Sequence, residues 1–322
     1  MSRTSAALLD QPGRVPRFGE LDVPGPAGDQ VVIRVAAAPI TPLDRLCATG
    51  RSYFGVPVTP YVPGVQGVGT VETGPIPAGT TVWFATTAGM QPGDGSMRSV
   101  VVADRRDVVE LPAGSDPVLI AALGLSAVAA WSAMTGPGGL SAGDRVLVLG
   151  AGGVVGQAGL QLARSAGAAR VIAAARSAAD LDRARRLGAD AAVAIEPGDD
   201  VDTLAARLID GAGGPVDLVL DPLFGVPAAA ALRTLRPGGR LVNLGSSAGE
   251  TAPIDSSTVR SRQVQIHGYT NNALTVEQRR AALTHVATEV LGGRLTVDHH
   301  RVPLAEVAQV WDRPGSRVVL VP

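Results

Sequence analysis

Residues 145–177 constrain the fold more than any other stretch of this chain. They read R-V-L-V-L-G-A-G-G-V-V-G-Q-A-G-L-Q-L-A-R-S-A-G-A-A-R-V-I-A-A-A-R-S. An apolar, β-rich run over 146–149 stops at Gly150, an apolar helix begins near Gly153, and a second apolar strand covers 170–174. A strand, a glycine turn, a helix and a further strand in this order predict the first half of a parallel α/β sheet.

The glycine turn also predicts a ligand. The strict G-x-G-x-x-G pattern is absent because its third position is Val155, but Gly150, Gly153 and Gly156 fit the spacing G-x-x-G-x-x-G. Backbone N–H groups at a helix N-terminus favour a pyrophosphate, and a Cβ there would hold the phosphate away from the backbone. The alternative is a glycine-rich turn that binds nothing. We expect a dinucleotide to contact Gly150, Gly152, Gly153, Val154 and Val155.

The end of the second strand predicts which nicotinamide cofactor is used. An acidic residue there would bond the ribose 2′-hydroxyl of NAD(H), whereas this strand ends on Arg176 and Ser177. A guanidinium and a hydroxyl suit the extra 2′-phosphate of NADPH (NADP+). The acidic residue Asp180 argues against a 2′-phosphate here. Its spacing from Ser177 is that of a capping box, however, which assigns it to the start of the next helix. We therefore predict NADPH.

Composition limits the other classes of function. The chain has 322 residues, 46% of them hydrophobic, and a formal net charge of −1, as expected for a globular protein of about two domains. Near-neutral charge gives no electrostatic case for a nucleic acid or a membrane surface. All basic residues are arginine, so lysine chemistry is excluded. The single cysteine, Cys47, fits a reducing compartment, and the early polar residues do not resemble a signal peptide, so we expect a cytoplasmic protein.

One apolar segment, 117–134, is nearly long enough to span a membrane. Turn sequences flank it on both sides, and it contains Gly124 and Ser126. We expect a buried helix and no membrane association.

The pattern of predicted secondary structure changes near residue 117. Before it, short strand-like runs over 31–35, 69–72 and 99–102 predict a mostly antiparallel β domain. After it, helices alternate with apolar strands, which predicts a doubly wound parallel sheet, so the fold class is α/β with a second β domain. Further strands are expected at 191–195, 217–220 and 241–244, with helices near 178–187, 201–209 and 226–235.

The last quarter of the chain completes both domains. Residues 263–267 predict an edge strand, 275–291 an amphipathic helix, 294–297 a further extended run and 317–321 a final strand that pairs with the first domain. We therefore expect a substrate domain from 1–115 and 270–322, and a dinucleotide-binding domain from 116–269.

This arrangement resembles the medium-chain dehydrogenase/reductase superfamily, and most closely its zinc-free quinone oxidoreductase branch. The resemblance covers nearly the whole chain. It rests on P-I-T-P-L-D (39–44), P-Y-V-P-G-V-Q-G-V-G (60–69), A-G-D-R-V-L-V-L-G-A-G-G-V-V-G (142–156), R-R-L-G-A-D (185–190), D-L-V-L-D (217–221), L-R-P-G-G-R-L-V (235–242) and the terminal R-V-V-L-V-P. It implies a Rossmann domain and a GroES-like domain.

The resemblance also implies chemistry without a metal. Zinc-dependent relatives carry a cysteine where this chain has Thr41 and a His-Glu pair where it has Val65 and Gln66. We therefore expect no metal, and no Lewis acid to polarise an alcohol oxygen. Zinc-free relatives reduce acceptors that conjugation already makes electrophilic, namely quinones and α,β-unsaturated carbonyls. The implied activity is hydride transfer from NADPH to such a small molecule.

Three residues are candidate catalytic groups by the same resemblance. Tyr53 lies near the place where enoyl-reducing relatives carry a tyrosine proton donor, although it could instead only shape the mouth of the site. Thr41 could bond a substrate oxygen or the nicotinamide ribose. Asp44 aligns with a common acidic residue and could orient Arg45 or Arg51, or close its loop through hydrogen bonds to the backbone.

The remaining candidates concern the cofactor and the assembly. Ser126 is expected to face the nicotinamide, and Ala129 replaces a threonine that relatives often use there. Asn243, Gly245 and Ser246 follow the last strand of the sheet, at the carboxyl edge where such sheets bind ligands. We expect a homodimer joined by the 263–267 strand. Two other functions remain open: an enoyl-thioester or enone reductase that tailors a biosynthetic product, and a protein that binds NADPH without turnover.

Overall fold

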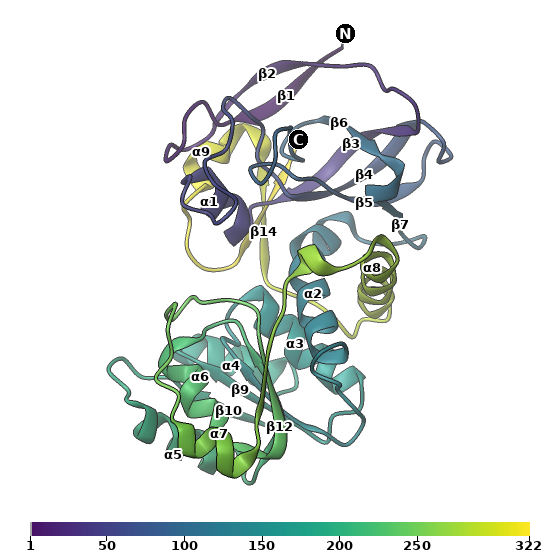
Figure 1. Ribbon diagram of the computed structural model, residues 1–322. Coiled ribbons are helices and arrows are strands. Elements are labelled where there is room, and N and C mark those ends of the chain that lie inside the picture. The colour runs from purple at the N-terminus through teal and green to yellow at the C-terminus, as the bar shows by residue number, and fades with distance from the viewer. Residues whose placement is uncertain (1) are drawn as a thin grey trace. The chain divides into compact units, whose positions relative to one another are not determined.

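The computed structural model describes residues 2–322, which form two compact units (Figure 1). Unit 1 comprises the chain up to Gly124 together with Leu283–Gly293 and Val297–Pro322. Unit 2 comprises Leu125–Ala282 and the short segment Arg294–Thr296. The chain passes from one unit to the other inside two helices and again on either side of Arg294–Thr296, so neither unit is a simple stretch of sequence.

Unit 2 is built on a six-stranded parallel sheet in the order β10-β9-β8-β11-β12-β13. This order is that of a doubly wound, dinucleotide-binding sheet, whose switch point lies between β8 and β11. The predicted fold class is confirmed. The strands are β8 (Arg145–Leu149), β9 (Arg170–Ala175), β10 (Ala191–Ala194), β11 (Val216–Asp221), β12 (Leu235–Asn243) and β13 (Gln265–Gly268).

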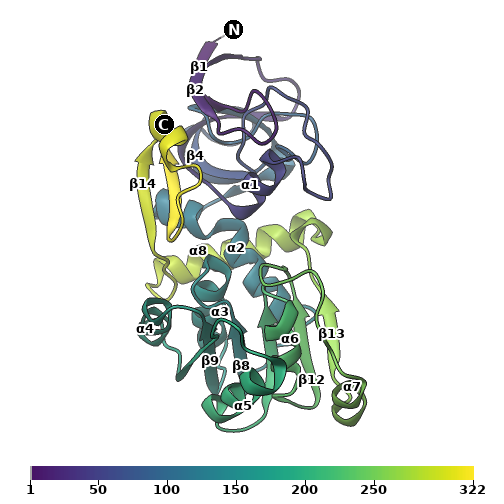
Figure 2. The ribbon, with the colours of Figure 1, turned by 90° about the vertical axis from the view of Figure 1, so that its left-hand side faces the viewer.

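Helices cover this sheet on its faces (Figure 2). Helix α3 packs on β8 and β9, while α5 and α6 pack against each other. The helices of the unit are α3 (Val154–Ser165), α4 (Ala178–Arg186), α5 (Val201–Ala212), α6 (Gly225–Leu232) and α7 (Ser256–Arg262), with a 3-10 turn at Asn271–Ala273.

The central strands are buried because their sequences are apolar without alternation. Residues 146–149 of β8 and 171–174 of β9 are fully buried. A strand covered by helices on both faces needs such a continuous apolar run. Strand β12 begins at Leu235, before the predicted 241, because a register shift against β11 accommodates the intervening P-G-G.

Unit 1 contains a seven-stranded sheet and a separate hairpin. The order is β14-β15-β3-β4-β5-β7, with β6 also paired to β3, and β1 pairs with β2 in the hairpin. Strand β15 pairs antiparallel with β3, so the predicted return of the final strand to the first domain is confirmed. The strands are β1 (Ser2–Leu8), β2 (Arg17–Val23), β3 (Gln30–Pro39), β4 (Gln66–Thr73), β5 (Thr81–Ala85), β6 (Val100–Asp104), β7 (Val108–Glu110), β14 (His299–Pro303) and β15 (Arg317–Val321).

Few helices belong to unit 1. They are α1 (Pro42–Ala48), α9 (Val307–Val310) and the first part of α2 (Pro117–Thr135), with the second part of α8 (Val276–Leu291) and 3-10 turns at Arg105–Asp107 and Leu304–Glu306. By length and composition α2 could cross a membrane, but 67% of its most apolar window is buried inside the protein, as in a core helix.

Residues 294–297, which follow α8, belong to no strand. Thr296 donates its N–H to Gln161 Oε1 at 3.0 Å, and its carbonyl accepts from Gln161 Nε2 at 2.8 Å. A side chain from α3 therefore satisfies the backbone groups that a strand would offer to a neighbour, and β14 begins only at His299.

Helix α2 is broken at Gly124, where the backbone has φ 29° and ψ −126°. The side chain of Gln66 lies against this break. It accepts a hydrogen bond from Trp83 Nε1 at 3.0 Å and donates to the Ala121 carbonyl at 3.5 Å. A Cβ at position 124 would collide with the Gln66 amide, so both the backbone conformation and the contact require glycine.

Replacing Gly124 by alanine should therefore destabilise unit 1 strongly. We expect G124A to lower the free energy of unfolding by roughly 2–4 kcal/mol, from positive φ and overpacking together. Chemical denaturation measures the loss. The matched control is G114A, because Gly114 also has positive φ (+83°) while its added Cβ would meet only Leu291 Cδ2 at 3.8 Å. Equal losses in the two variants would contradict the role given to Gln66.

Candidate functional site

The glycine turn between β8 and α3 is held by close backbone approaches. Gly150 has φ +64°, and its carbonyl accepts the Gly153 N–H at 3.0 Å. A Cβ at Gly156 would collide with the Gly150 carbonyl and lie 2.6 Å from Ala151 Cα. Gln157 Nε2 donates to the Gly152 carbonyl at 2.8 Å, which fixes the turn from the helix side.

The first turn of α3 is open to a ligand. Gly153 is its N-cap, and among residues 2–322 no side chain caps this helix start. Val154 and Val155, the first helical residues, are half-buried, and Gly153 itself is exposed. An uncapped helix N-terminus presents N–H groups and a positive dipole end, so these residues fit the pyrophosphate of a dinucleotide.

The corner at the end of β9 carries the residues predicted to choose the cofactor. Arg176 is exposed and forms no ion pair within the described part of the chain. Ser177 is the N-cap of α4, accepting the Asp180 N–H at 3.1 Å and donating its hydroxyl proton to Asp180 Oδ2 at 2.6 Å. The helix start predicted from the spacing of these two residues is present.

At the carboxyl edge of the sheet, Asn243 joins two loops. Its Nδ2 donates to Asp221 Oδ2 at 2.9 Å and to the Gly245 carbonyl at 2.8 Å. A Cβ at Gly245 would lie 2.8 Å from the Pro222 carbonyl, so this loop packs closely on the end of β11. Ser246 bonds Glu250 in the same loop. The structure brings Asn243 and Gly245 together, whereas Ser246 is engaged within its own turn.

Sequence reasoning did not single out Asp221, which anchors this edge. It is fully buried, and its Oδ1 accepts the N–H groups of Leu223 and Phe224 at 2.9 Å each. Burial raises the pKa of the Asp221 carboxyl, and the hydrogen bonds from Phe224, Asn243 and Leu223 oppose that rise. A lone acidic residue closing an apolar strand, as in D-L-V-L-D, is the signal that could have found it.

Ser126 is half-buried on α2, just after the break at Gly124. Next to it, the Leu125 carbonyl accepts a hydrogen bond from Asn271 Nδ2 at 2.9 Å. Tyr269 donates to Asn271 Oδ1 at 2.7 Å, so a short polar chain fixes the backbone beside Ser126. Ala129, one turn further along, is buried.

In unit 1, Thr41 and Asp44 form the capping box of α1. Thr41 Oγ1 donates to Asp44 Oδ2 at 2.6 Å and accepts the Asp44 N–H at 3.2 Å. Asp44 also accepts the N–H groups of Thr41 at 2.7 Å and Val65 at 2.9 Å. Asp44 therefore closes its loop through hydrogen bonds to the backbone, which is one of the two roles expected for it. The Thr41 hydroxyl is therefore already engaged as a hydrogen-bond donor to Asp44.

The charge of Asp44 faces a buried arginine. Burial raises the pKa of the Asp44 carboxyl, while its hydrogen bonds and the Arg317 charge act against that rise. Burial also lowers the pKa of Arg317 to about 10, with Asp44 opposing the shift, and Arg317 donates to the Ile40 carbonyl at 3.0 Å. The final strand is thereby tied to the segment that holds Thr41.

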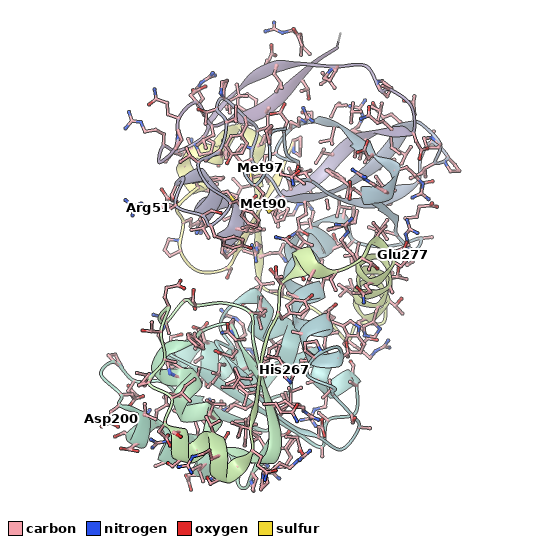
Figure 3. All side chains as sticks on the ribbon, in the orientation of Figure 1. Arg51, Met90, Met97, Asp200, His267 and Glu277 are labelled. Atoms are coloured by element: carbon pink, nitrogen blue, oxygen red, sulfur yellow. The ribbon has the colours of Figure 1, made fainter. Side chains whose placement is uncertain are left out.

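Tyr53 lies apart from this network, in the loop after α1. Its side chain is 79% exposed, and its ring centroid lies 4.1 Å from that of Phe54. Within residues 2–322 its hydroxyl forms no hydrogen bond. Arg51, at the start of this loop, is exposed and labelled in Figure 3. Tyr53 is thus a phenol whose proton is not engaged by the described part of the protein.

A cavity of about 480 Å³ lies elsewhere in unit 1, between the β1–β2 hairpin and the β14 and β15 strands. Its lining contains Phe18, Arg301 and Leu304, and none of the predicted site residues. The cavity does not define the candidate site.

Comparisons with known proteins agree with this geometry. Residues 154–288 match the family model described as "Zinc-binding dehydrogenase". Human quinone oxidoreductase is 27% identical over 300 residues, which cover 91% of this chain and 87% of that protein. These similarities indicate a medium-chain dehydrogenase/reductase of the quinone oxidoreductase type. A fold of this type implies a nicotinamide cofactor.

Two further relatives bear on the fold and on possible chemistry. A phenolphthiocerol/phthiocerol polyketide synthase protein of Mycobacterium tuberculosis is 30% identical over 320 residues, covering 92% of this chain. The chain spans only 14% of the length of that synthase. The structure of a mycobacterial quinone oxidoreductase aligns with a TM-score of 0.87 at 22% identity, covering 99% of this chain and 100% of that one.

The residues of this chain do not fit the zinc that the family description names. Thr41, Val65 and Gln66 occupy the expected ligand positions, and the Gln66 amide is bonded to Trp83 and Ala121. Among the described residues, no group of three or more His, Cys, Asp or Glu could hold a metal ion. Threonine, valine and glutamine supply neither a thiolate nor an imidazole, which zinc sites use.

The turn gives a test that separates binding from folding. A Cβ at Gly153 would meet only the Gly150 carbonyl at 3.6 Å, whereas a Cβ at Gly156 cannot be accommodated. We expect G153A to keep the unfolding midpoint while weakening NADP+ binding about tenfold or more, because the methyl group faces the phosphate. G156A should lower both the unfolding midpoint and the affinity for NADP+. Calorimetric titration and thermal unfolding measure the two quantities, and unchanged NADP+ binding by G153A would contradict the turn as the pyrophosphate site.

Proposed function

We propose that this protein is an NADPH-dependent reductase that transfers hydride to a quinone or an α,β-unsaturated carbonyl without zinc. The observation that carries the proposal is the open start of α3, which lies in the same unit as Arg176, a cation without an ion-pair partner among the described residues. An exposed guanidinium at the end of β9 suits a 2′-phosphate, where an acidic residue would repel it. The lack of zinc ligands restricts the acceptors to those already activated by conjugation.

Each group of site residues has a separate task in this proposal. A bound NADPH supplies the hydride from its nicotinamide ring. Gly153, Val154 and Val155 hold the pyrophosphate, and Arg176 holds the adenosine 2′-phosphate, while the Ser177 hydroxyl stays bonded to Asp180. Ser126 and Gly245 contact the nicotinamide end. Substrate binding is assigned to unit 1 and dinucleotide binding to unit 2.

The proton balance of the reaction points to Tyr53. Reduction of an enone leaves an enolate that needs one proton at the α-carbon. The Thr41 hydroxyl donates its hydrogen bond to Asp44, and the Asp44 carboxylate also accepts the N–H groups of Thr41 and Val65. Tyr53, exposed and free of hydrogen bonds within the described residues, is the available donor, while Asp44 positions Thr41.

A second candidate function is reduction of an enoyl thioester in a biosynthetic pathway. The similarity to a polyketide synthase supports it, since this match covers nearly the whole chain. The chemistry is the same, with a thioester carbonyl as the electron acceptor, so the two candidates differ in the acceptor alone. We also propose a cytoplasmic homodimer, for which the exposed edge strand β13 is the candidate interface.

The proposal is tested by cofactor oxidation with chelator-treated protein. NADPH and NADH are each run against quinones, simple enones and an enoyl thioester of N-acetylcysteamine. We expect turnover with NADPH that a chelator does not abolish, and the preferred acceptor separates the two candidates. Tight NADPH binding without turnover on any acceptor would instead support the binding-only function.

Tyr53 gives a sharper test of the proton step. We expect Y53F to lower kcat for enones about tenfold or more, because a general acid contributes at least this much, while quinone reduction changes little. Quinone reduction delivers its protons to exposed oxygens, which water can protonate. Stopped-flow measurement of NADPH oxidation gives both rates. F54Y, which alters the ring partner of Tyr53, is the matched control, and an equal loss in Y53F on both substrates would contradict the role.

A further inference from the structure

A carboxylate lies directly on the glycine turn. A Cβ added at Gly152 would come within 2.5 Å of both Cγ and Oδ2 of Asp180. Asp180 belongs to the first turn of α4, so a residue after the second strand reaches back to the turn after the first strand. Gly152 is therefore glycine because Asp180 takes up the space that its side chain would need.

The same carboxylate is held by two partners. Ser177 donates its hydroxyl to Asp180 Oδ2 at 2.6 Å, and Arg183 Nη1 lies 2.6 Å from Oδ1. The Arg183 and Asp180 side chains are only 21% and 30% exposed, so this ion pair is better shielded than most surface pairs. The two contacts fix the carboxylate between the turn and the end of β9.

The position of Asp180 bears on the choice of cofactor. In dinucleotide-binding sheets, an acidic group at this corner bonds the ribose 2′-hydroxyl of NAD(H) and repels the 2′-phosphate of NADP(H). Here Arg183 forms an ion pair with that acid, and the exposed Arg176, four residues before Asp180 in the sequence, has no ion-pair partner among residues 2–322. Together, Arg176, Asp180 and Arg183 carry one net positive charge.

We propose that the Asp180–Arg183 pair is a specificity device that sets how strongly this protein prefers NADP(H) over NAD(H). Arg183 masks the acid that would otherwise select NAD(H), and Asp180 limits the preference that two free arginines would give. This inference rests on the NADPH-linked function proposed above and deepens it. Both residues act on the 2′ position of the adenosine ribose, distant in sequence from the residues assigned to the nicotinamide end.

The test is calorimetric titration of the purified protein with NADP+ and with NAD+. We expect R183Q to weaken NADP+ binding about fivefold or more while NAD+ binding holds or improves, because an unmasked charge lies near the phosphate. D180N should strengthen NADP+ binding by a similar factor. The ratio of the two affinities should therefore rise in the order R183Q, wild type, D180N.

The same helix supplies the matched controls. Arg185 and Asp182 form an ion pair with the same i,i+3 spacing, but their side chains are 54% and 63% exposed. D182N and R185Q change the net charge of α4 by the same amounts away from the turn, and they should leave the affinity ratio within about twofold of wild type. Thermal unfolding checks that each variant is folded. If R183Q does not fold, the affinity ratio of D180N alone tests the proposal.

The outcomes separate this inference from the proposed function. If wild-type protein binds NADP+ but D180N and R183Q shift the ratio no more than D182N and R185Q, the specificity device is overturned and the proposed function stands. If wild-type protein binds neither nucleotide, the proposed function fails, and this inference fails with it.

Discussion

The close backbone approach between Gly150 and Gly156 is the constraint on which unit 2 depends. No side chain fits between these two residues, so β8 can turn directly into α3 and leave the helix start uncapped. The apolar strands on either side of the turn are buried on both faces and hold it in place. The turn therefore suits the pyrophosphate of a dinucleotide, and the proposed reductase function rests on this fit.

Unit 1 depends on buried polar groups that have hydrogen-bond partners. Gln66 is bonded to Trp83 and lies against the break in α2, and Asp44 joins Thr41 to Val65 beside the buried Arg317. Such groups are costly to bury unless they are paired, and here each is hydrogen-bonded. The positions where zinc-dependent relatives carry ligands have thus become parts of the internal scaffold, which agrees with a reductase of acceptors that need no Lewis acid.

The sequence predicted whatever depends on local pattern. Continuous apolar runs identified β8 and β9, glycine spacing identified the turn, and the Ser177–Asp180 spacing identified the start of α4. The sequence did not predict features that depend on a side chain far away in the chain. The break at Gly124 depends on Gln66, the irregular path at Thr296 depends on Gln161, and the anchoring role of Asp221 depends on Asn243. These contacts join elements far apart in the chain, so no periodic pattern in the sequence predicts them.

The central claim is that this chain transfers hydride from NADPH to a conjugated acceptor without a metal. The most direct measurement uses chelator-treated protein with NADPH dideuterated at C4 of the nicotinamide and a conjugated enone, with mass spectrometry of the reduced product. The account predicts one deuterium, located at the β-carbon. A reduced product without deuterium, or one that forms only when zinc is restored, would contradict it.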